Sequence, residues 1–286
     1  MKKQLLPLIE RLVDAVERMA PRKVEYADIQ GAEAFIWNAE EKILRPVWHV
    51  HRVDMELLRG IELVADLLYN NTKQFASGLP ANNALLWGAR GMGKSSLVKA
   101  VHARVNQEVE RKLALIEIAR EDISSLPDLL TILRKTDRRF ILFCDDLSFE
   151  PHEISYKTLK SVLEGGVEAK PDNVIFYATS NRRHLLAREA TENEAGSALH
   201  PGEVVHEKLS LSDRFGLWLG FHQCSEAMYQ DMVAHYAKTY GLTISTKELQ
   251  AAANEWSRTR GARSGRVAWQ FIQDLAGKMG KHISQN

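Results

Sequence analysis

One nine-residue stretch constrains the fold of this chain more than any other. It reads Gly88-Ala89-Arg90-Gly91-Met92-Gly93-Lys94-Ser95-Ser96. The string matches G-x-x-x-x-G-K-[ST], a loop whose backbone N–H groups surround phosphate oxygens. Its glycines allow the backbone conformations that turn several N–H groups toward one point. The match predicts that Lys94 reaches the β- and γ-phosphates of a nucleoside triphosphate and that Ser95 ligates Mg²⁺.

The residues on either side of this loop supply the setting that it requires. Residues 83–87 form a short apolar run, which is typical of a buried strand. Residues 96–101 begin an amphipathic pattern with Leu97, Val98 and Val101 on one side. Because the free N–H groups and the dipole of a helix N-terminus attract anions, strand, loop and helix is the order expected of a phosphate-binding loop. A chance glycine-rich turn does not account for this order.

The composition is that of a globular chain and argues against several classes of protein. The 286 residues suffice for one large domain or two modest ones, and 45% of them are hydrophobic. Cys144 and Cys224 stand far apart, which argues against a zinc ribbon or a redox motif. No apolar run reaches the roughly 18 residues of a spanning helix, and the N-terminus lacks the apolar stretch of a signal peptide. We therefore expect a cytoplasmic protein with no membrane partner.

The net charge of the chain is +1, which bears on nucleic acid as a partner. Broad, non-specific binding of nucleic acid requires a clustered excess of Lys and Arg. The net charge argues against such binding, although it allows a local basic patch.

The residues before the loop predict a helix and a hairpin. Residues 3–19 carry apolar side chains at helical spacing. Two apolar runs at 34–37 and 47–50 are interpreted as the strands of a hairpin. His49 and His51 would share one face of the second strand, where a metal site is one interpretation; without a third ligand nearby, packed or exposed histidines are favoured.

From residue 55 onward, helical and strand patterns alternate, which predicts a parallel sheet wrapped by helices. Strands are expected at 113–119, 140–145, 173–179 and 216–221, and helices at 55–70, with leucines mostly inward, 123–134 and 155–163. Residues 187–207 have little apolar content and are interpreted as a long surface loop. The pattern from 225 to 279 is helical throughout. We therefore predict three parts: a helix and hairpin in residues 1–55, an α/β nucleotide-binding domain in 56–224, and an all-α domain in 225–286.

An apolar run at residues 140–144 ends in Asp145 and Asp146. In a parallel sheet that binds phosphate, the carboxyl ends of the strands face the ligand. We assign Asp145 to the hydration shell of Mg²⁺ and Asp146 to the polarisation of an attacking water. The alternative is an ordinary strand followed by an acidic turn. This alternative is weaker, because the two acids follow a phosphate-loop motif in the chain.

A second apolar strand, at 173–179, ends in small polar groups. It places Asn181 to contact a γ-phosphate or a water. Arg182, Arg183 and His184 follow at once and form a dense basic spot. The alternative is a loop whose charges are simply solvated.

Asp213-Arg214-Phe215 precedes the last expected strand. Arg214 could simply pair with Asp213. It could instead reach the γ-phosphate bound by a neighbouring subunit, and such arginine fingers are worth roughly 10³–10⁵ in rate. A finger that one subunit supplies to another requires a head-to-tail interface, and hence a homo-oligomeric ring or helix. A hexamer is one such oligomer.

The last helix opens with Arg260-Gly261-Ala262-Arg263-Ser264-Gly265-Arg266. An arginine here could swing over a nucleotide and couple hydrolysis to domain motion. Arg266 is preferred, because Val267 and Phe271 then continue an apolar face. Arg263 remains the alternative.

In their order along the chain, these motifs resemble those of the AAA+ ATPases over residues 56–280. The strings at 143–150, 180–185 and 210–217 resemble a bacterial family of predicted ATPases called domain of unknown function 815. The resemblance implies an α/β P-loop NTPase with a parallel five-stranded sheet in the order 5-1-4-3-2 and a small helical lid. It also implies ATP and Mg²⁺ as cofactors, sensor roles for Asn181 and Arg266, and finger duty for Arg214.

The chain departs from the superfamily at its acidic strand end, which reads Asp-Asp where Asp-Glu is usual. Asp146 is one methylene shorter than the usual base, and Glu150 is a candidate substitute. This departure bears on the rate of turnover rather than on ATP binding.

Three functions stay open from the sequence. The first is an oligomeric remodelling ATPase that acts on a macromolecular client. The second is a nucleotide-gated nucleic-acid loader akin to helicase loaders, with its basic surface supplied by Arg182, Arg183, Arg258, Arg260, Arg263 and Arg266. The third is a non-hydrolysing switch or scaffold, which the Asp-Asp ending permits.

Overall fold

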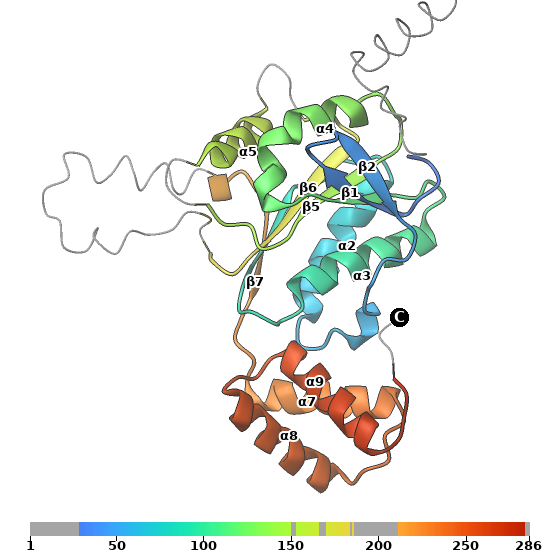
Figure 1. The fold of residues 1–286 in the computed structure, drawn as a ribbon, viewed down its shortest axis with the longest axis vertical. Helices are drawn as coiled ribbons and strands as arrows, with labels where there is room; N and C mark the ends of the chain where they lie inside the picture. Colours follow the sequence, from blue (N-terminus) through green and yellow to red (C-terminus); the bar gives the residue numbers. More distant parts are fainter. Residues whose placement is uncertain (1–28, 150–152, 166–169, 184, 186–210, 284–286) are drawn as a thin grey trace, which may run out of the picture.

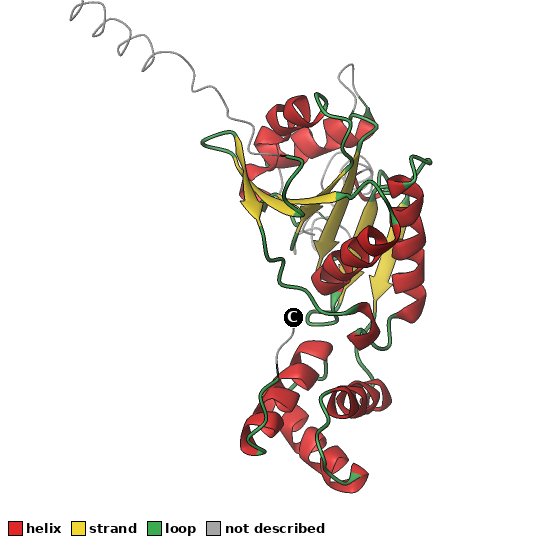
Figure 2. Cartoon of the chain, turned by 90° about the vertical axis from the view of Figure 1, so that its right-hand side faces the viewer, coloured by secondary structure: helices red, strands yellow, loops and turns green. Residues whose placement is uncertain are grey.

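The computed structural model describes residues 29–149, 153–165, 170–183, 185 and 211–283 (Figure 1). The helix predicted at 3–19 and the loop predicted at 187–207 therefore lie outside the described residues. A twisted sheet occupies the middle of the molecule with helices on both of its faces, and three C-terminal helices lie beyond one end of the strands (Figure 2).

The sheet has seven strands in the order β2-β1-β4-β5-β6-β3-β7. The strands are β1 (Ala34–Asn38), β2 (Ile43–Val47), β3 (Ala84–Gly88), β4 (Ala114–Glu117), β5 (Phe140–Cys144), β6 (Val174–Ser180) and β7 (Leu217–Phe221). All neighbouring strands pair in parallel except β1 and β2. Counted from β3 along the chain, five strands stand in the order 5-1-4-3-2, which confirms the expected topology.

The predicted hairpin extends this sheet beyond the five expected strands. β1 pairs in parallel with β4, and β2 runs antiparallel to β1 with Ala34 opposite Val47. The prediction of a second strand at 47–50 is wrong, since β2 ends at Val47 and both His49 and His51 are exposed beyond it. The short connection between Asn38 and Ile43 explains the shift, because hairpin loops rarely exceed five residues.

One face of the sheet is covered by α2 (Glu62–Ala76) and α3 (Lys94–Glu108). The helix predicted at 55–70 begins later than expected: a short 3-10 turn, η1 (Met55–Leu57), comes first, and Gly60 at φ 77° separates it from α2. The apolar residues before Gly60 therefore do not belong to α2, and their spacing does not indicate which face of this helix is buried. As a result, Leu63 and Leu67 are 75% and 44% exposed rather than turned inward.

The other face is covered by a 3-10 segment and two helices, which are η2 (Arg120–Ser125), α4 (Leu126–Leu133) and α5 (Ile154–Glu164). They enclose a second core in which Leu129, Leu133 and Leu159 are fully buried against β4, β5 and β6. The two cores keep the sheet rigid, so the ends of its strands are fixed in position.

The C-terminal part consists of three helices, which are α7 (Glu226–Thr239), α8 (Thr246–Arg260) and α9 (Gly265–Lys278). Each begins at a serine whose hydroxyl accepts a backbone N–H of the first turn, which satisfies a donor that the helix itself leaves free. The proposed boundary near residue 224 falls between the end of β7 and the start of α7. None of the described helices combines the length and apolar character needed to cross a bilayer.

Candidate nucleotide-binding site

The loop at residues 88–93 connects β3 to the start of α3 and depends on its glycines. Gly88, Gly91 and Gly93 have φ values of 123°, 74° and 89°, which side chains disfavour. A Cβ atom on Gly88 would lie 2.1 Å from the carbonyl oxygen of Phe221. Gly93 is the left-handed residue from which α3 begins, so the loop delivers the chain directly into a helix N-terminus.

Lys94 is the first residue of α3, and its side chain turns back into the loop. The ammonium group donates to the carbonyl oxygens of Gly88 and Ala89, each at 2.9 Å, and to Oδ1 of Asn181 at 3.0 Å. The residue is only 7% exposed. Burial lowers the pKa of Lys94, while Asp145 and Asp146 act in the opposite direction. The ammonium thus stands at the centre of the loop, surrounded by oxygen acceptors.

The two acids of the sequence motif lie at the carboxyl end of β5, beside α3. The Ser95 hydroxyl donates to Oδ1 of Asp145 at 2.5 Å. Asp146 has a φ of 51°, a conformation uncommon outside glycine, which marks a tight turn immediately after the strand. Asn181 donates from Nδ2 to Oδ1 of Asp146 at 2.5 Å, so Asn181 connects Lys94 to Asp146. The structure therefore brings Lys94, Ser95, Asp145, Asp146 and Asn181 together at one edge of the sheet.

Thr179 positions both acids, and no motif in the sequence marked it. It is a buried residue of β6, the strand beside β5. Its hydroxyl donates to Oδ1 of Asp145 at 2.5 Å and accepts from the backbone N–H of Asp146 at 2.9 Å. Threonine is common in strands for its shape alone, and therefore its type gives little signal of this role.

A cavity of about 640 Å³ opens beside the loop, between the sheet and the C-terminal helices. Pockets of about 300–1,000 Å³ are usual for small-molecule ligands. The polar part of the lining consists of the loop, the acids, Thr179 and Asn181. The apolar part comes from the segment before α2 and from α7 and α9, namely Val53, Leu57, Leu58, Ile61, Met232, Tyr236 and Trp269. These apolar residues belong to no motif, since they come from separate parts of the chain.

The C-terminal helices contact the loop directly through the start of α9. The backbone N–H of Arg266 donates to the carbonyl oxygen of Gly91 at 3.1 Å. A Cβ on Gly91 would lie 2.8 Å from the Ser264 hydroxyl, so this close approach requires glycine. Arg266 lines the cavity. Arg263 does not line it and forms an ion pair with Glu226 at 2.8 Å.

Arg214 lies at the amino ends of the parallel strands (the amino edge). The phosphate-loop motif and the acids lie at the opposite, carboxyl ends (the carboxyl edge). Arg214 precedes β7, which is parallel to β3, whereas the loop at residues 88–93 follows β3. A five-residue strand is roughly 17 Å long at about 3.3 Å per residue, which separates Arg214 from the loop of its own chain. Its guanidinium pairs with Glu164 at the end of α5, 2.9 Å away. Glu150 and His184, which were also named from the sequence, lie outside the described residues.

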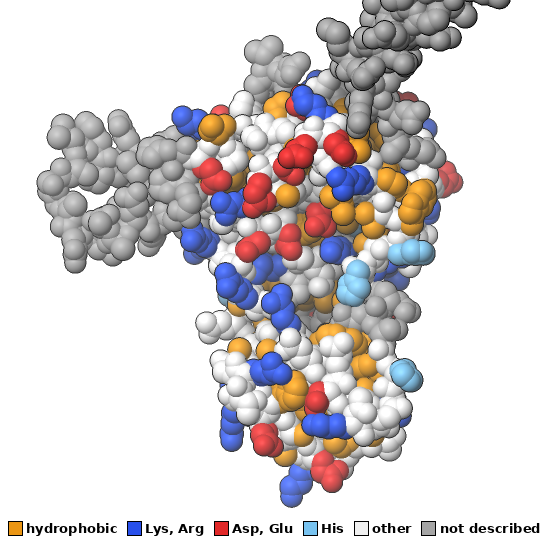
Figure 3. Space-filling view, in the orientation of Figure 1, with side chains coloured by type: hydrophobic (Ala, Val, Ile, Leu, Met, Phe, Trp, Pro, Cys, Tyr) orange, Lys and Arg blue, Asp and Glu red, His pale blue; other side chains and the backbone are white. Residues whose placement is uncertain are grey.

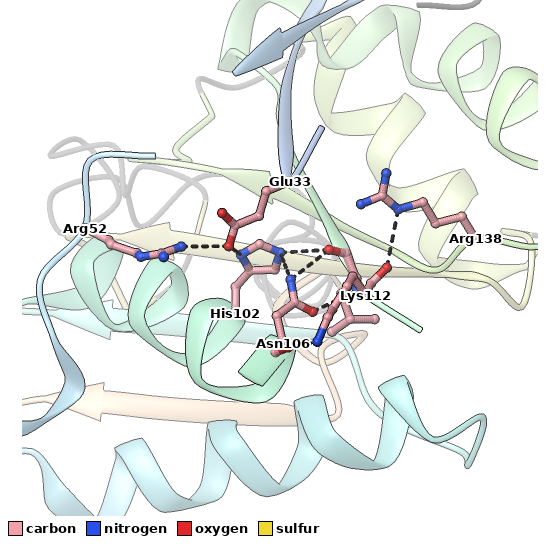
Figure 4. Close-up of polar contacts among 7 residues, drawn as sticks. Glu33, Arg52, His102, Asn106, Lys112 and Arg138 are labelled. Atoms are coloured by element: carbon pink, nitrogen blue, oxygen red, sulfur yellow. Dashed lines mark hydrogen bonds and ion pairs between the residues drawn. The ribbon is translucent and has the colours of Figure 1, made fainter. Parts of the chain in front are cut away.

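A buried polar network holds α3 in place (Figure 4). His102 on α3 is fully buried and donates from Nε2 to the carbonyl oxygen of Leu113 at 3.0 Å, just before β4. Asn106 exchanges hydrogen bonds with the backbone of the same residue, at 2.8 and 3.0 Å. Nδ1 of His102 lies 4.0 Å from Glu33, which pairs with Arg52 at 2.7 Å. Burial lowers the pKa of His102, so the neutral imidazole ties α3 to the sheet.

The oxygens of Ser95 and Asp145 fit a magnesium ion. Mg²⁺ binds oxygen ligands, and in phosphate sites it usually takes one or two carboxylates together with phosphate and water oxygens. A hydroxyl and a carboxylate that lie 2.5 Å apart beside a phosphate loop are a donor set of this kind. Within the described ranges, no group of three or more His, Cys, Asp or Glu side chains is placed to hold a metal ion.

A family model described as "Protein of unknown function (DUF815)" matches residues 30–279 of the chain. Two mutants of RuvB from Thermotoga maritima superpose with a TM-score of 0.52 at 16% identity; the match covers 82% of this chain and 69% or 70% of theirs. PCH-2 of C. elegans superposes with a TM-score of 0.51 at 16% identity and 79% and 71% coverage. No curated protein matched the sequence. The solved structures have the AAA+ fold, and at this identity they establish the fold alone.

Proposed function

This chain belongs to the DUF815 family and has the AAA+ fold, and from that premise we propose that it is an oligomeric ATPase that remodels a macromolecular client. The observation that carries the proposal is the meeting of Lys94, Ser95, Asp145, Asp146 and Asn181 in a single cavity. Separate segments of the chain supply these groups, and an ATP-binding site explains why all of them face one point.

ATP binding follows from the polar and apolar residues that line the cavity together. The backbone N–H groups of the loop and of the first turn of α3 bind the phosphates, and the Lys94 ammonium exchanges its carbonyl partners for β- and γ-phosphate oxygens. The apolar part of the lining, which includes Leu57 and Trp269, suits a nucleobase. Ser95 and Asp145 hold Mg²⁺, which neutralises phosphate charge when it is bound.

Asp146 is the proposed base for hydrolysis. Its carboxylate takes a proton from a water whose oxygen forms a bond to the γ-phosphorus. The bond from that phosphorus to the β,γ-bridging oxygen breaks, and ADP leaves with the electron pair. Asn181 orients the Asp146 carboxylate, and Thr179 fixes the backbone of the same residue. Because an aspartate is shorter than the usual glutamate, this account expects slow turnover.

Arg214 completes the site of a neighbouring copy rather than its own. Its place at the opposite edge of the sheet and its absence from the cavity lining support this assignment. The edge of one copy that carries Arg214 then contacts the edge of the next copy that carries the phosphate site, which is a head-to-tail contact. Repetition of that contact generates a ring or a helix.

The proposal is tested by steady-state ATP hydrolysis of the wild-type protein and of Arg214→Ala. We expect hydrolysis by the wild type and a loss on the order of 10³ in the variant, with little change in ATP affinity, because the finger acts on transition-state charge. Arg45→Ala is the matched control, since Arg45 also forms an exposed ion pair with a glutamate. Equal turnover of wild type and Arg214→Ala, or no hydrolysis by either, contradicts the proposal.

A further inference from the structure

A second cavity, of about 570 Å³, lies on the other side of the phosphate loop at the same edge of the sheet. Its charged and aromatic lining comes from Trp87, Arg90, Arg182, Arg183 and His222, and none of the described residues lines it with a carboxylate. Arg90, Arg182 and Arg183 form no ion pair with any described acid. Arg90 and Asn181 line both cavities, so this basic cavity adjoins the phosphate end of the nucleotide cavity.

Among the cations of this cavity, Arg183 has the best-defined position, because its guanidinium packs on an aromatic ring. Its guanidinium carbon lies 5.2 Å from the centroid of the Trp87 ring, a cation–π distance. The ring lies flat against Gly220, where a Cβ would stand 3.0 Å from it, and packs edge-on to His222. Among the described residues, no side chain or carbonyl accepts a hydrogen bond from Arg183. Trp87 thus holds an arginine whose donors remain available.

The opposite edge of the sheet carries a matching acid. Glu164 ends α5 and pairs with Arg214, and the two side chains are 34% and 47% exposed. A phosphate of a neighbouring copy would compete with Glu164 for the Arg214 guanidinium. If Arg214 left this pair, the Glu164 carboxylate would stand without a partner beside a triphosphate, where like charges repel.

We propose that the basic cavity receives the Glu164 edge of the neighbouring copy, and that Arg183 binds the Glu164 carboxylate when Arg214 moves to the γ-phosphate. This inference rests on the proposed function, which supplies the head-to-tail contact. The exchange replaces one arginine partner of Glu164 with another, so no charge is left unpaired. Because Asn181 lines both cavities and contacts Lys94, a segment in the basic cavity lies next to the phosphate site.

Charge complementarity favours a second copy of this chain over nucleic acid as the occupant. Figure 3 shows Asp and Glu side chains gathered over the α4–α5 part of the molecule, and Lys and Arg side chains near the junction with the C-terminal helices. The net charge of +1 argues against a broad basic surface along which a nucleic-acid backbone could continue. Acidic and basic side chains that gather on different parts of one chain fit its assembly with a second copy.

The test is a charge exchange between the two edges, with assembly as the readout. Glu164→Arg, Arg183→Glu and the double variant are compared with wild type by sedimentation velocity over a protein concentration series, with β,γ-imido-ATP and Mg²⁺. We expect each single variant to raise the concentration at half assembly by about tenfold or more, and the double variant to return to within about threefold of wild type. The exchange Glu41→Arg with Arg45→Glu, an ion pair within the hairpin, is the matched control and leaves assembly unchanged.

Circular dichroism melting of each variant separates unfolding from loss of assembly, and Arg183→Gln provides a milder variant in which assembly still weakens. No change in the single variants, or no recovery in the double variant, overturns the inference. Salt-dependent binding of a single-stranded oligonucleotide that Arg183→Glu abolishes without any change in assembly overturns it too, in favour of nucleic acid. In each case a loss of hydrolysis in Arg214→Ala leaves the proposed function standing, whereas a wild type that neither assembles nor hydrolyses ATP removes both.

Discussion

The two edges of the sheet hold their functional groups in different ways. At the carboxyl edge, Lys94, Asp145 and Asn181 are connected by hydrogen bonds of 2.5–3.0 Å to other groups of the same chain. At the amino edge, backbone hydrogen bonds fix the turn before Phe215, but the Arg214 side chain is held by a single half-exposed ion pair. Exposed pairs of this kind contribute about 0–1 kcal/mol. The carboxyl-edge groups are therefore held in one geometry by contacts within their own chain. The Arg214 side chain, which is proposed to act on a neighbouring copy, is easily released from its ion pair.

The largest expected effect on ATP binding comes from Lys94→Ala at the carboxyl edge. The variant loses a charged donor to the phosphates, and we expect ATP affinity to fall by about 100-fold, since a hydrogen bond to a charged group is worth about 1.5–3 kcal/mol. Isothermal titration calorimetry with ATP and Mg²⁺ measures this loss. Lys99→Ala, on the same helix but outside the cavity lining, serves as the control and keeps wild-type affinity. Unchanged affinity in Lys94→Ala would show that the loop is not the phosphate site.

Thr179→Val sharpens the comparison without removing a charge. Valine keeps the shape of threonine but lacks the hydroxyl that holds Asp145 and the backbone of Asp146. We expect turnover to fall by about 10- to 100-fold with ATP affinity little changed, because a small misplacement of catalytic groups costs up to about 10² in rate. Single-turnover hydrolysis measures the chemical step. Thr179→Ser retains the hydroxyl and most of the activity; equal activity in the valine variant would mean that the acids are held without Thr179.

The smallest expected effect concerns stability and the buried His102 of α3, which contacts the residue before β4. Burial lowers the pKa of His102 from 6.5, with Glu33 opposing the shift and Arg52 and Arg138 adding to it. Below about pH 6.5 the unfolded chain therefore binds a proton that the folded chain excludes, so the contribution of His102 to stability is lost as pH falls, at up to about 1.4 kcal/mol per pH unit.

Urea denaturation of wild type and His102→Gln at pH 7.5 and 5.5 tests this prediction. The free energy of unfolding should fall between the two pH values by about 1 kcal/mol more in the wild type than in the variant, because glutamine takes up no proton. The same pH dependence in both proteins would contradict the role of His102.

The sequence predicted those parts of the molecule in which adjacent residues decide the structure. Residues 88–96 define their own loop, because the glycines, the lysine and the start of the helix are contiguous. The acids after β5 could be expected at the carboxyl edge for the same reason, and the order of the strands followed from the resemblance to AAA+ ATPases, which the fold confirms.

The parts that the sequence did not predict depend on contacts between distant segments. Leu63 has the spacing of a core residue but is exposed, since α2 starts only after Gly60. Thr179 gains its role only through pairing of β6 with β5. Trp269 lines the cavity because α9 packs against the phosphate loop through Gly91. None of these contacts can be deduced from local periodicity.

The central claim is that one active site is shared between two copies, with Lys94 from one and Arg214 from the other. Mixing Lys94→Ala with Arg214→Ala tests it most directly, because each variant lacks what the other carries. In an equal mixture, half of the subunits keep Lys94 and half of their neighbours keep Arg214, so turnover should recover to about a quarter of the wild-type value. Turnover no higher than that of the two variants measured separately, although sedimentation shows that they co-assemble, would contradict the account.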